Sequence, residues 1–310
     1  MSLGEGWELN HVGLVVTNRN ATLSHFQSLG VGVSVGPQPL LPHEDGHGSL
    51  MYYQTLNGDP VTRTYPTGGA HNFRDGECQI GDCQLEVYAM KPGPGMFISE
   101  YLAKQGPGIN HICFNAPAVE QDTDQLIQRD CPLTFNALVN GKTVENYLDT
   151  RRHGDLMLSL RPPATDWEKA WKANNESHPL VPRWRFLGLG IAVRDADASA
   201  AYYAGLGFEA CADEHRDSHF ETRTRRVRIG PIAFEFCEST AAHSVLTDSL
   251  HRRGDGVNDL VFAVDDLPAE IARLEARSVK ILRTAVDGQS VYLDTRAEGN
   301  IMVRLVAGGG

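Results

Sequence analysis

The sequence of 310 residues has no long hydrophobic run, few cysteines, and fewer basic than acidic side chains. No apolar stretch approaches the roughly 20 residues that a membrane-spanning helix needs, so no membrane segment is expected. Residues 1–6 have neither the basic nor the apolar region of a signal peptide, so secretion is not expected. The six cysteines include no CxxC pair and no dense framework, which predicts reduced thiols in a cytoplasmic protein.

Positive charge is also scarce. The chain has 28 Lys and Arg against 39 Asp and Glu, a formal net charge of −11, so it gains little from counterion release on a phosphate backbone. The densest basic group alternates along one short segment, which predicts a solvated strand face and not a nucleic-acid surface. This group comprises Arg223, Arg225, Arg226 and Arg228. With 41% hydrophobic and 22% charged residues, the composition is that of a globular protein and excludes fibrous and disordered classes.

The most informative feature that is present is an internal repeat. Four segments recur in the same order further along the chain: residues 9–16 match 186–193, residues 80–87 match 229–236, residues 108–111 match 256–259, and residues 147–151 match 292–296. The offset falls from 177 to 149 after the first segment and then stays nearly constant. Because chance matches keep neither order nor spacing, the sequence predicts a tandem duplication.

Each copy divides again into two modules. A short apolar run is followed by a helical segment and then by short strands between turn residues, and this order occurs four times. The expected helices are 21–29, 119–128, 197–204 and 267–276. In the last one, Leu267, Ile271 and Leu274 recur at the spacing of one buried helical stripe. The predicted fold class is therefore α+β, with four βαβββ-type modules paired into two domains.

Two segments fall outside the repeat. The first copy carries 28 additional residues within the Pro-, Gly- and His-rich stretch 36–73, which is predicted to be an inserted loop, either functional or disordered. Residues 163–184 combine prolines with a polar stretch, which predicts a linker with a short amphipathic piece at 167–171. The expected domains are therefore 7–162 and 185–307.

Motifs in the modules resemble the vicinal oxygen chelate superfamily, which includes glyoxalase I, methylmalonyl-CoA epimerase, extradiol dioxygenases and bleomycin-resistance proteins. The module openings Asn-His-Val-Gly-Leu-Val-Val at 10–16 and Gly-Ile-Asn-His-Ile-Cys-Phe at 108–114 carry the resemblance. The Asp-Thr-Arg segment at 149–151 is similar to a signature of glyoxalase-like members. The first copy is most similar to glyoxalase I and to methylmalonyl-CoA epimerase-like members. The resemblance implies two curved-sheet domains, with a divalent metal at the centre of a cleft.

The resemblance also implies a ligand set. In the first copy, His11, Glu86 and His111 occupy ligand positions, and Ser159 stands at the fourth, where a carboxylate is usual. Two imidazoles and one carboxylate suit one divalent ion of Fe, Mn, Co, Ni or Zn, and the missing ligand leaves room for water or substrate. The second copy lacks both histidines and is expected to be degenerate and structural. Its four positions hold Gly188, Glu235, Asp259 and Arg304, of which the arginine is expected to pair with one of the two carboxylates.

Further side chains are candidates for contact with a substrate. The inserted segment is expected to be mostly a hydrophilic surface, from which His43 and Glu44 are the candidates for a catalytic base. Arg151 and Ser159 are candidate substrate contacts. The recurrence of Arg151 as Arg296 in the second copy favours a structural ion pair for this arginine over substrate binding.

These features predict a metal-dependent isomerase, epimerase or lyase that acts on a small oxygenated substrate. The metal would bind two neighbouring substrate oxygens and stabilise an enolate while a side-chain base moves the proton. The alternative is an extradiol-type ring-cleaving dioxygenase with the same three ligands, although typical two-domain members of that class hold the metal in the second copy. A third class is a small-molecule binding protein without turnover. No nucleic-acid or membrane partner is expected, and a homodimer is left open.

Overall fold

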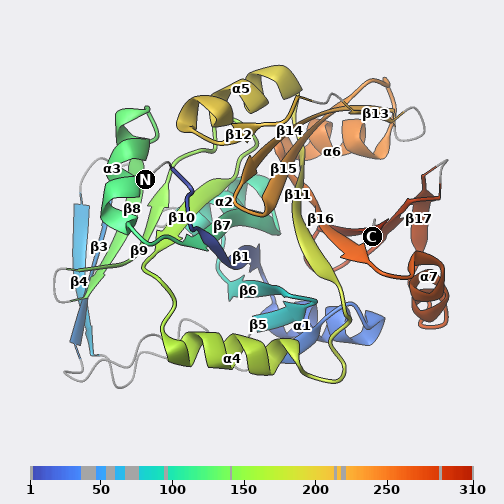
Figure 1. Ribbon diagram of the computed structural model, residues 1–310, viewed down its shortest axis with the longest axis horizontal. Helices are drawn as coiled ribbons and strands as arrows, with labels where there is room; N and C mark the ends of the chain where they lie inside the picture. Colours follow the sequence, from blue (N-terminus) through green and yellow to red (C-terminus); the bar gives the residue numbers. More distant parts are fainter. Residues whose placement is uncertain are drawn as a thin grey trace.

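The computed structural model describes residues 3–35, 47–53, 60–66, 77–93, 97–139, 142–212, 215–217, 221–285 and 288–308. Two sheets lie side by side at the centre, and helices cover them from outside (Figure 1). The N-terminal sheet contains β1 (Glu8–Val16), β2 (Val33–Val35), β3 (His47–Tyr53), β4 (Pro60–Pro66), β5 (Glu77–Ile80), β6 (Cys83–Ala89), β7 (Gly108–Asn115), β8 (Leu133–Val139), β9 (Lys142–Leu148) and β10 (Met157–Arg161).

The C-terminal sheet contains β11 (Arg185–Ala192), β12 (Glu209–Ala210), β13 (His215–Asp217), β14 (Thr222–Ile229), β15 (Ile232–Ser239), β16 (Gly256–Val264), β17 (Ile281–Thr284), β18 (Ser290–Leu293) and β19 (Met302–Ala307). The helices are α1 (Arg19–Leu29), α2 (Phe97–Gln105), α3 (Val119–Gln128), α4 (Asp166–Glu176), α5 (Ala196–Leu206), α6 (Val245–Arg253) and α7 (Leu267–Glu275). No helix in the part of the chain described above is long and apolar enough to span a membrane.

The two sheets have the same topology. The strand order is β2-β5-β6-β1-β7-β10-β9-β8-β3-β4 in the N-terminal sheet and β12-β14-β15-β11-β16-β19-β18-β17 in the C-terminal sheet, where β13 also pairs with β14. Apart from β3, β4 and β13, the strands correspond one to one in chain order. The α+β fold class and the tandem duplication predicted from the sequence are therefore confirmed.

The register around the central strand of each sheet is also the same. In the N-terminal sheet, Gly13 of β1 pairs with Glu86 of β6 and with His111 of β7. The equivalent residues of the C-terminal sheet pair in the same way, and they are Gly190, Glu235 and Asp259. Residues matched by the sequence repeat therefore occupy equivalent places in space.

The first helix of each copy begins and ends on equivalent residues. Asn18 and Asp195 cap α1 and α5, because each side chain accepts a hydrogen bond from a backbone N–H three residues further on. Gly30 and Gly207 end these helices at φ 68° and 108°, a left-handed conformation that favours glycine. The helices expected from the sequence correspond to α1, α3, α5 and α7, each within two residues at either end.

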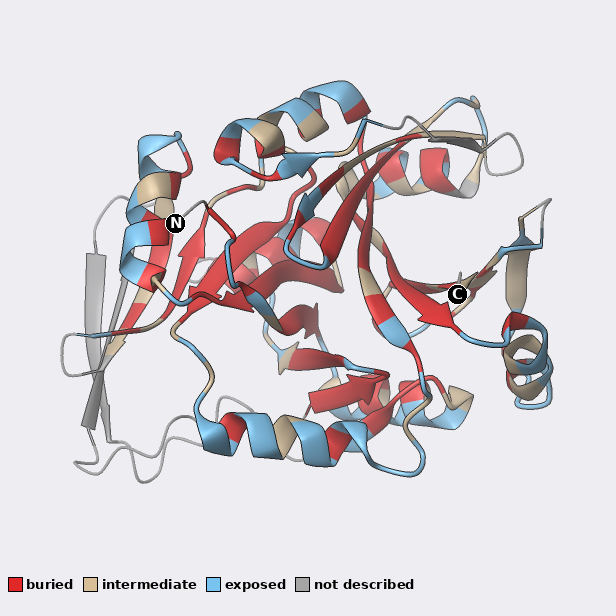
Figure 2. Ribbon diagram, viewed as in Figure 1, coloured by how far each residue is buried: buried red, intermediate tan, exposed pale blue. Residues whose placement is uncertain are grey.

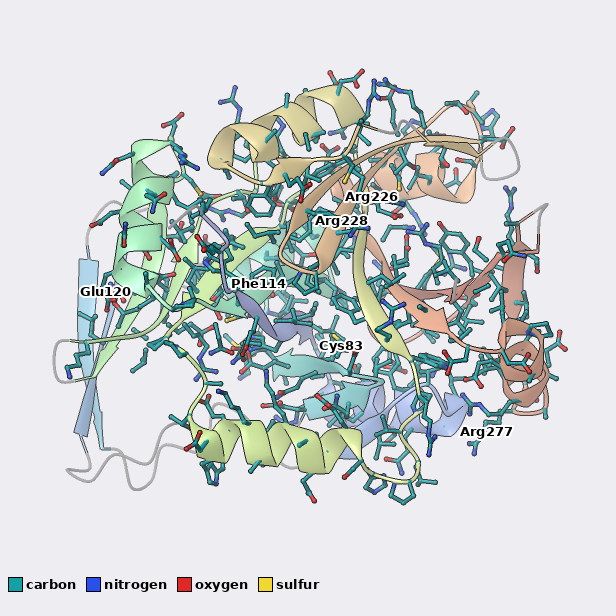
Figure 3. The ribbon with its side chains drawn as sticks, viewed as in Figure 1. Cys83, Phe114, Glu120, Arg226, Arg228 and Arg277 are labelled. Carbon is teal, nitrogen blue, oxygen red and sulfur yellow. The ribbon has the colours of Figure 1, made fainter. Side chains whose placement is uncertain are left out.

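One apolar core runs through both sheets. Fully buried members include Leu14 and Phe114 from the N-terminal sheet and Leu189 and Phe262 from the C-terminal sheet. Figure 2 shows the central strands buried and the outward faces of the helices exposed. In Figure 3, Phe114 lies in the interior, whereas Arg277, just after α7, lies at the periphery. The two copies therefore pack as one body around a shared core.

The inserted stretch 36–73 contains two strands. Strand β3 pairs with β4 and, on its other side, with β8. Strand β2, which precedes the insertion, lies at the opposite end of the sheet order from β8. The insertion therefore connects the two ends of the N-terminal sheet, and its hairpin extends the sheet beyond β8.

The stretch between the two copies contains a helix longer than the amphipathic piece expected at 167–171. This helix, α4, begins at a capping box in which Thr165 is the N-cap. Lys172 of α4 donates hydrogen bonds to the backbone carbonyls of Leu9 and Asn10, at 3.2 and 2.6 Å. The helix is therefore fixed to β1 beside the first predicted metal ligand.

Candidate metal centre

Three neighbouring strands bring together the three predicted ligands. His11 comes from β1, Glu86 from β6 and His111 from β7, and all three side chains are buried. The Nε2 atom of His11 lies 3.0 Å from Nε2 of His111 and 2.9 Å from Oε2 of Glu86. The third separation, between His111 Nε2 and Glu86 Oε2, is 3.8 Å. One ligand atom from each residue therefore points to a common centre.

Glycine at position 13 makes room for the second imidazole. A Cβ atom on Gly13 would lie 1.8 Å from Cε1 of His111, far inside van der Waals contact. The equivalent Gly190 has the same role in the second copy, where a Cβ atom would lie 2.3 Å from Oδ1 of Asp259. In both copies, therefore, this position needs glycine to leave room for the side chain on the facing strand.

A chain of amides fixes the protonation of His11. The carbonyl of Pro162 can only accept, so Asn115 donates to it through Nδ2, at 2.6 Å. Oδ1 of Asn115 then accepts from Nδ2 of Asn10, at 2.8 Å. Oδ1 of Asn10 lies 2.7 Å from Nδ1 of His11 and also accepts from Arg161. Because Oδ1 can only accept, Nδ1 of His11 carries the proton, and Nε2 presents a lone pair to the centre.

His111 is held in a similar way. Its Nδ1 atom lies 2.9 Å from Oδ1 of Asn110, the residue before it, as His11 lies beside Asn10. Such partners on the outer nitrogen orient a ligating imidazole and raise its basicity. Both imidazoles are therefore oriented before any ion is bound.

The spacing of the three atoms fits a divalent ion. Two ligand atoms at about 2.1 Å from an ion, with their bonds at right angles, lie about 3.0 Å apart. The two separations from His11 Nε2, 3.0 and 2.9 Å, match this value. Two imidazole nitrogens and a carboxylate oxygen are also the donor set that Fe, Mn, Co, Ni and Zn accept. The residues present therefore suit the ion that the fold implies.

A second carboxylate, Glu145 of β9, lies beside His11 and Cys113 at the edge of this centre, although the sequence analysis did not single it out. Its Oε1 atom lies 4.0 Å from Nε2 of His11. Ser159, at the fourth ligand position on β10, donates a hydrogen bond from Oγ to this Oε1 atom, at 3.0 Å. Both side chains are buried. The Ser159 hydroxyl therefore contacts Glu145. A contact between Ser159 and substrate stays a prediction.

Two tyrosines adjoin the ligands. The hydroxyl of Tyr88 donates to Oε2 of Glu86 at 2.5 Å, and the hydroxyl of Tyr147 lies 3.4 Å from Nε2 of His111. Burial raises the pKa of Tyr147 well above its usual value, and the nearby Glu145 carboxylate adds to the effect. Tyr147 is therefore neutral at physiological pH and available as a hydrogen-bond donor.

Cys113 lies close to this group as well, since its sulfur, a nitrogen of His11 and an oxygen of Glu145 lie within 4.8 Å of one another. Burial raises the pKa of the Cys113 thiol well above its usual value, and the charge of Glu145 raises it further. A thiol with such a pKa is protonated and weakly nucleophilic. Cys113 therefore acts as a packing residue beside the centre.

Arg151 forms a structural ion pair. Its guanidinium contacts Asp149 twice, at 2.8 and 2.5 Å, and Arg296 contacts Asp294 in the equivalent turn of the second copy. Arg151 also lines a cavity of about 650 Å³ together with Tyr202 and other residues, and none of the three predicted metal ligands is among them. Because the same Arg–Asp pair occurs in both copies, the position of Arg151 is explained without a substrate. A contact between Arg151 and substrate stays a prediction.

The second copy holds a guanidinium where the first has its centre. Arg304 contacts Oδ2 of Asp259 at 3.0 Å and also pairs with Glu235, so the predicted pairing is present with both carboxylates. Arg226 of β14 contacts the other oxygen of Glu235 at 2.5 Å. At the first ligand position, a Cβ atom on Gly188 would lie 1.9 Å from a backbone carbonyl oxygen. At the positions equivalent to the candidate ligands, this copy therefore holds paired charges, and its purely structural role stays a prediction.

The basic group on β14, predicted to form a solvated strand face, is partly exposed and largely paired with carboxylates. Arg223 contacts Asp197 and Glu238, and Arg225 also contacts Asp197. The candidate bases His43 and Glu44 lie outside the described residues. Their role therefore stays a proposal.

Comparison with known proteins agrees with this architecture. No protein-family profile and no curated protein matches the sequence. A mutant of 4-hydroxymandelate synthase from Streptomyces coelicolor superposes over 99% of this chain and 93% of its own, with a TM-score of 0.65 and 14% identity. Methylmalonyl-CoA epimerase from Streptomyces coelicolor matches 41% of this chain and 98% of its own, with 23% identity and a TM-score of 0.37. The full-length superposition shows that the chain has the same two-domain fold as this synthase, and the matching strand order of the two sheets agrees with it.

Proposed function

We propose that the protein is an enzyme dependent on one divalent metal ion, held in the first copy by His11, Glu86 and His111. The observation that carries this proposal is the convergence of two oriented imidazole nitrogens and a carboxylate oxygen, with separations of 2.9–3.8 Å. The second copy supports it, because a guanidinium contacts the two carboxylates at the equivalent positions. In the first copy, a bound divalent ion would supply the positive charge that the guanidinium supplies in the second.

The proposed reaction is an isomerisation, epimerisation or elimination of a small oxygenated substrate. A bound ion at such a centre supplies Lewis-acid stabilisation for the negative charge of an enolate. The amide chain behind His11 directs the Nδ1 proton away from the centre and Nε2 toward it, and the neutral hydroxyl of Tyr147 is placed to donate a hydrogen bond beside His111. A base must also move the substrate proton. His43 and Glu44 of the insertion remain the proposed candidates.

An oxygen-dependent ring-cleaving dioxygenase is the second candidate. The observation that favours it is the donor set itself, since two histidines and one carboxylate also form the facial triad of oxygen-activating iron enzymes. Turnover in strict anaerobiosis, compared with turnover in air, distinguishes the two. We expect equal rates and entry of solvent deuterium at a carbon of the product. Stoichiometric oxygen uptake with a yellow ring-fission product from a catechol would establish the dioxygenase instead.

Metal analysis tests the centre before any substrate is known. Protein purified without chelator should contain one divalent ion per chain, and His11→Ala and His111→Ala should each lose tight binding, because two remaining ligands rarely compete with water. His153→Ala is the control, since this side chain stacks on Tyr202 away from the three ligands. Metal retained after both ligand changes would refute the assignment. A protein that binds a small molecule without metal would support the third class, a binding protein.

The proposal also includes the substrate class, the cellular location and the oligomeric state. We infer that the substrate is a small molecule, because the acidic composition disfavours a nucleic-acid partner. We also infer a cytoplasmic location, because the cysteine pattern is typical of reduced thiols. A homodimer stays open. Size-exclusion chromatography with light scattering, on the metal-loaded chain, measures the oligomeric state directly.

A further inference from the structure

We propose that Glu145 is the fourth ligand of the centre, and that it replaces, from the adjacent strand, the carboxylate missing at Ser159. This inference rests on the proposed metal centre and identifies a ligand beyond the three that the motifs indicate. It turns a site of two histidines and one carboxylate into one of two histidines and two carboxylates.

The position of Glu145 supports this role. Strand β9 runs antiparallel to β10, and Ser159 pairs with Tyr147, two residues after Glu145 on the same face of β9. The serine side chain is too short to reach the centre from β10. Its hydroxyl instead donates to Oε1 of Glu145, and this oxygen lies 4.0 Å from Nε2 of His11. The hydroxyl therefore holds the carboxylate on the His11 side of the centre.

The charges of the two copies agree with this assignment. In the second copy, the carboxylates of Glu235 and Asp259 contact the guanidinium groups of Arg304 and Arg226, so two negative charges meet two positive charges. In the first copy, the carboxylates are those of Glu86 and a residue on β9. Two carboxylates and two neutral imidazoles balance the charge of one divalent cation.

The two copies differ at both positions of the pair Glu145 and Ser159. At the offset of the last repeated segment, Glu145 corresponds to Ser290 and Ser159 corresponds to Arg304. The first copy thus has a carboxylate on β9 and a hydroxyl on β10. The second copy has a hydroxyl on the equivalent β18 and a cation on the equivalent β19. In the first copy these two side chains hydrogen-bond to each other, whereas in the second Arg304 contacts Glu235 and Asp259.

The test uses Co(II) and the full chain after removal of bound metal. Affinity is measured by competition with a chelator, and the visible absorption spectrum of the bound Co(II) reports its coordination. Glu145→Gln should weaken Co(II) binding at least about 10-fold and change the spectrum. Ser159→Ala keeps the carboxylate but removes the hydrogen bond that holds it, so it should have a smaller effect in the same direction.

A rescue variant and a control complete the experiment. Glu145→Gln combined with Ser159→Glu restores a carboxylate from β10 and should regain affinity and the four-ligand spectrum. Asp155→Asn is the control, since this buried carboxylate accepts a hydrogen bond from Gln105 in a different part of the fold and should leave both readouts unchanged. Circular dichroism confirms that each variant is folded.

The outcomes separate the inference from the proposed function. If the unmodified chain binds no Co(II), the proposed metal centre fails and the fourth ligand fails with it. If the unmodified chain binds one Co(II), and Glu145→Gln binds it with the same affinity and spectrum, only the assignment of Glu145 is overturned.

Discussion

Removal of Arg304 is expected to destabilise the protein strongly, although this residue lies in the copy without the metal ligands. Its side chain is 15% exposed and contacts Glu235 and Asp259, which are 10% and 2% exposed. Arg304→Ala leaves both carboxylates in a buried site with one fewer positive charge. Breaking a buried ion pair from one side costs about 3–5 kcal/mol of unfolding free energy. Urea denaturation followed by circular dichroism measures the difference.

The pH dependence of this loss has a defined sign. Burial by itself raises the pKa of Glu235, but the guanidinium groups of Arg304 and Arg226 outweigh it and hold that pKa below its usual value. Glu235 therefore stabilises the native protein above its unfolded pKa, and this contribution is lost as the pH falls through the folded pKa. Without Arg304, burial favours the protonated carboxyl, and the penalty grows as the pH rises. The deficit of Arg304→Ala should therefore be smaller at about pH 5 than at about pH 7.5.

A matched control comes from the same domain. Arg296→Ala removes a guanidinium from Asp294, but that pair is more exposed, at 32% and 22%, so the loss should be about 1 kcal/mol or less. If Arg304→Ala and Arg296→Ala cost the same, or if the deficit of Arg304→Ala does not change with pH, the charge-balance explanation for the second copy is wrong.

Three further outcomes are expected. Gly13→Ala should displace the His111 ring and weaken metal binding, whereas Gly190→Ala should lower stability and leave the metal content unchanged; metal titration and urea denaturation distinguish them. Asn115→Leu breaks the amide chain behind the first imidazole and should weaken metal binding by about 10- to 100-fold, and an unchanged affinity would show that the chain does not orient this ligand. A thiol reagent should modify Cys211 first, because the other five cysteines are buried and burial raises the pKa of each; fast modification of a second thiol, mapped by mass spectrometry, would contradict this.

The repeat predicted most of the fold because the residues that define it are local. Glycines at helix ends, such as Gly30 and Gly207, and the ligand positions keep their spacing in both copies, so one alignment of the chain with itself gives the modules and their equivalent residues. Helices α2 and α6 were not among the expected helices, although they connect the paired modules in both copies. At an offset of 148, the offset of the segment that follows them, Ser99 matches Thr247, Glu100 matches Asp248 and Leu102 matches Leu250, so the repeat did carry a signal for these helices.

Glu145 shows why the candidate site was only partly predictable. A comparison of the copies finds residues that recur or that are replaced at a known position, and this glutamate corresponds to a serine at a position without an assigned role. Its proximity to His11 depends on the sheet order β1-β7-β10-β9, which brings together residues far apart in the chain. The available signal was a lone carboxylate on the strand face that also carries Tyr147.

The backbone at Gly188 has a consequence for any conversion of the second copy into the first. This residue has φ 149°, and a Cβ atom there would lie 1.9 Å from the carbonyl oxygen of Ala233 on the neighbouring strand. Because main-chain atoms block the position, replacing Gly188 by histidine cannot rebuild the first ligand unless β11 and β15 also move apart. The difference between the two copies at this position therefore lies in the main chain as well as in the side chains, and a single substitution does not convert one arrangement into the other.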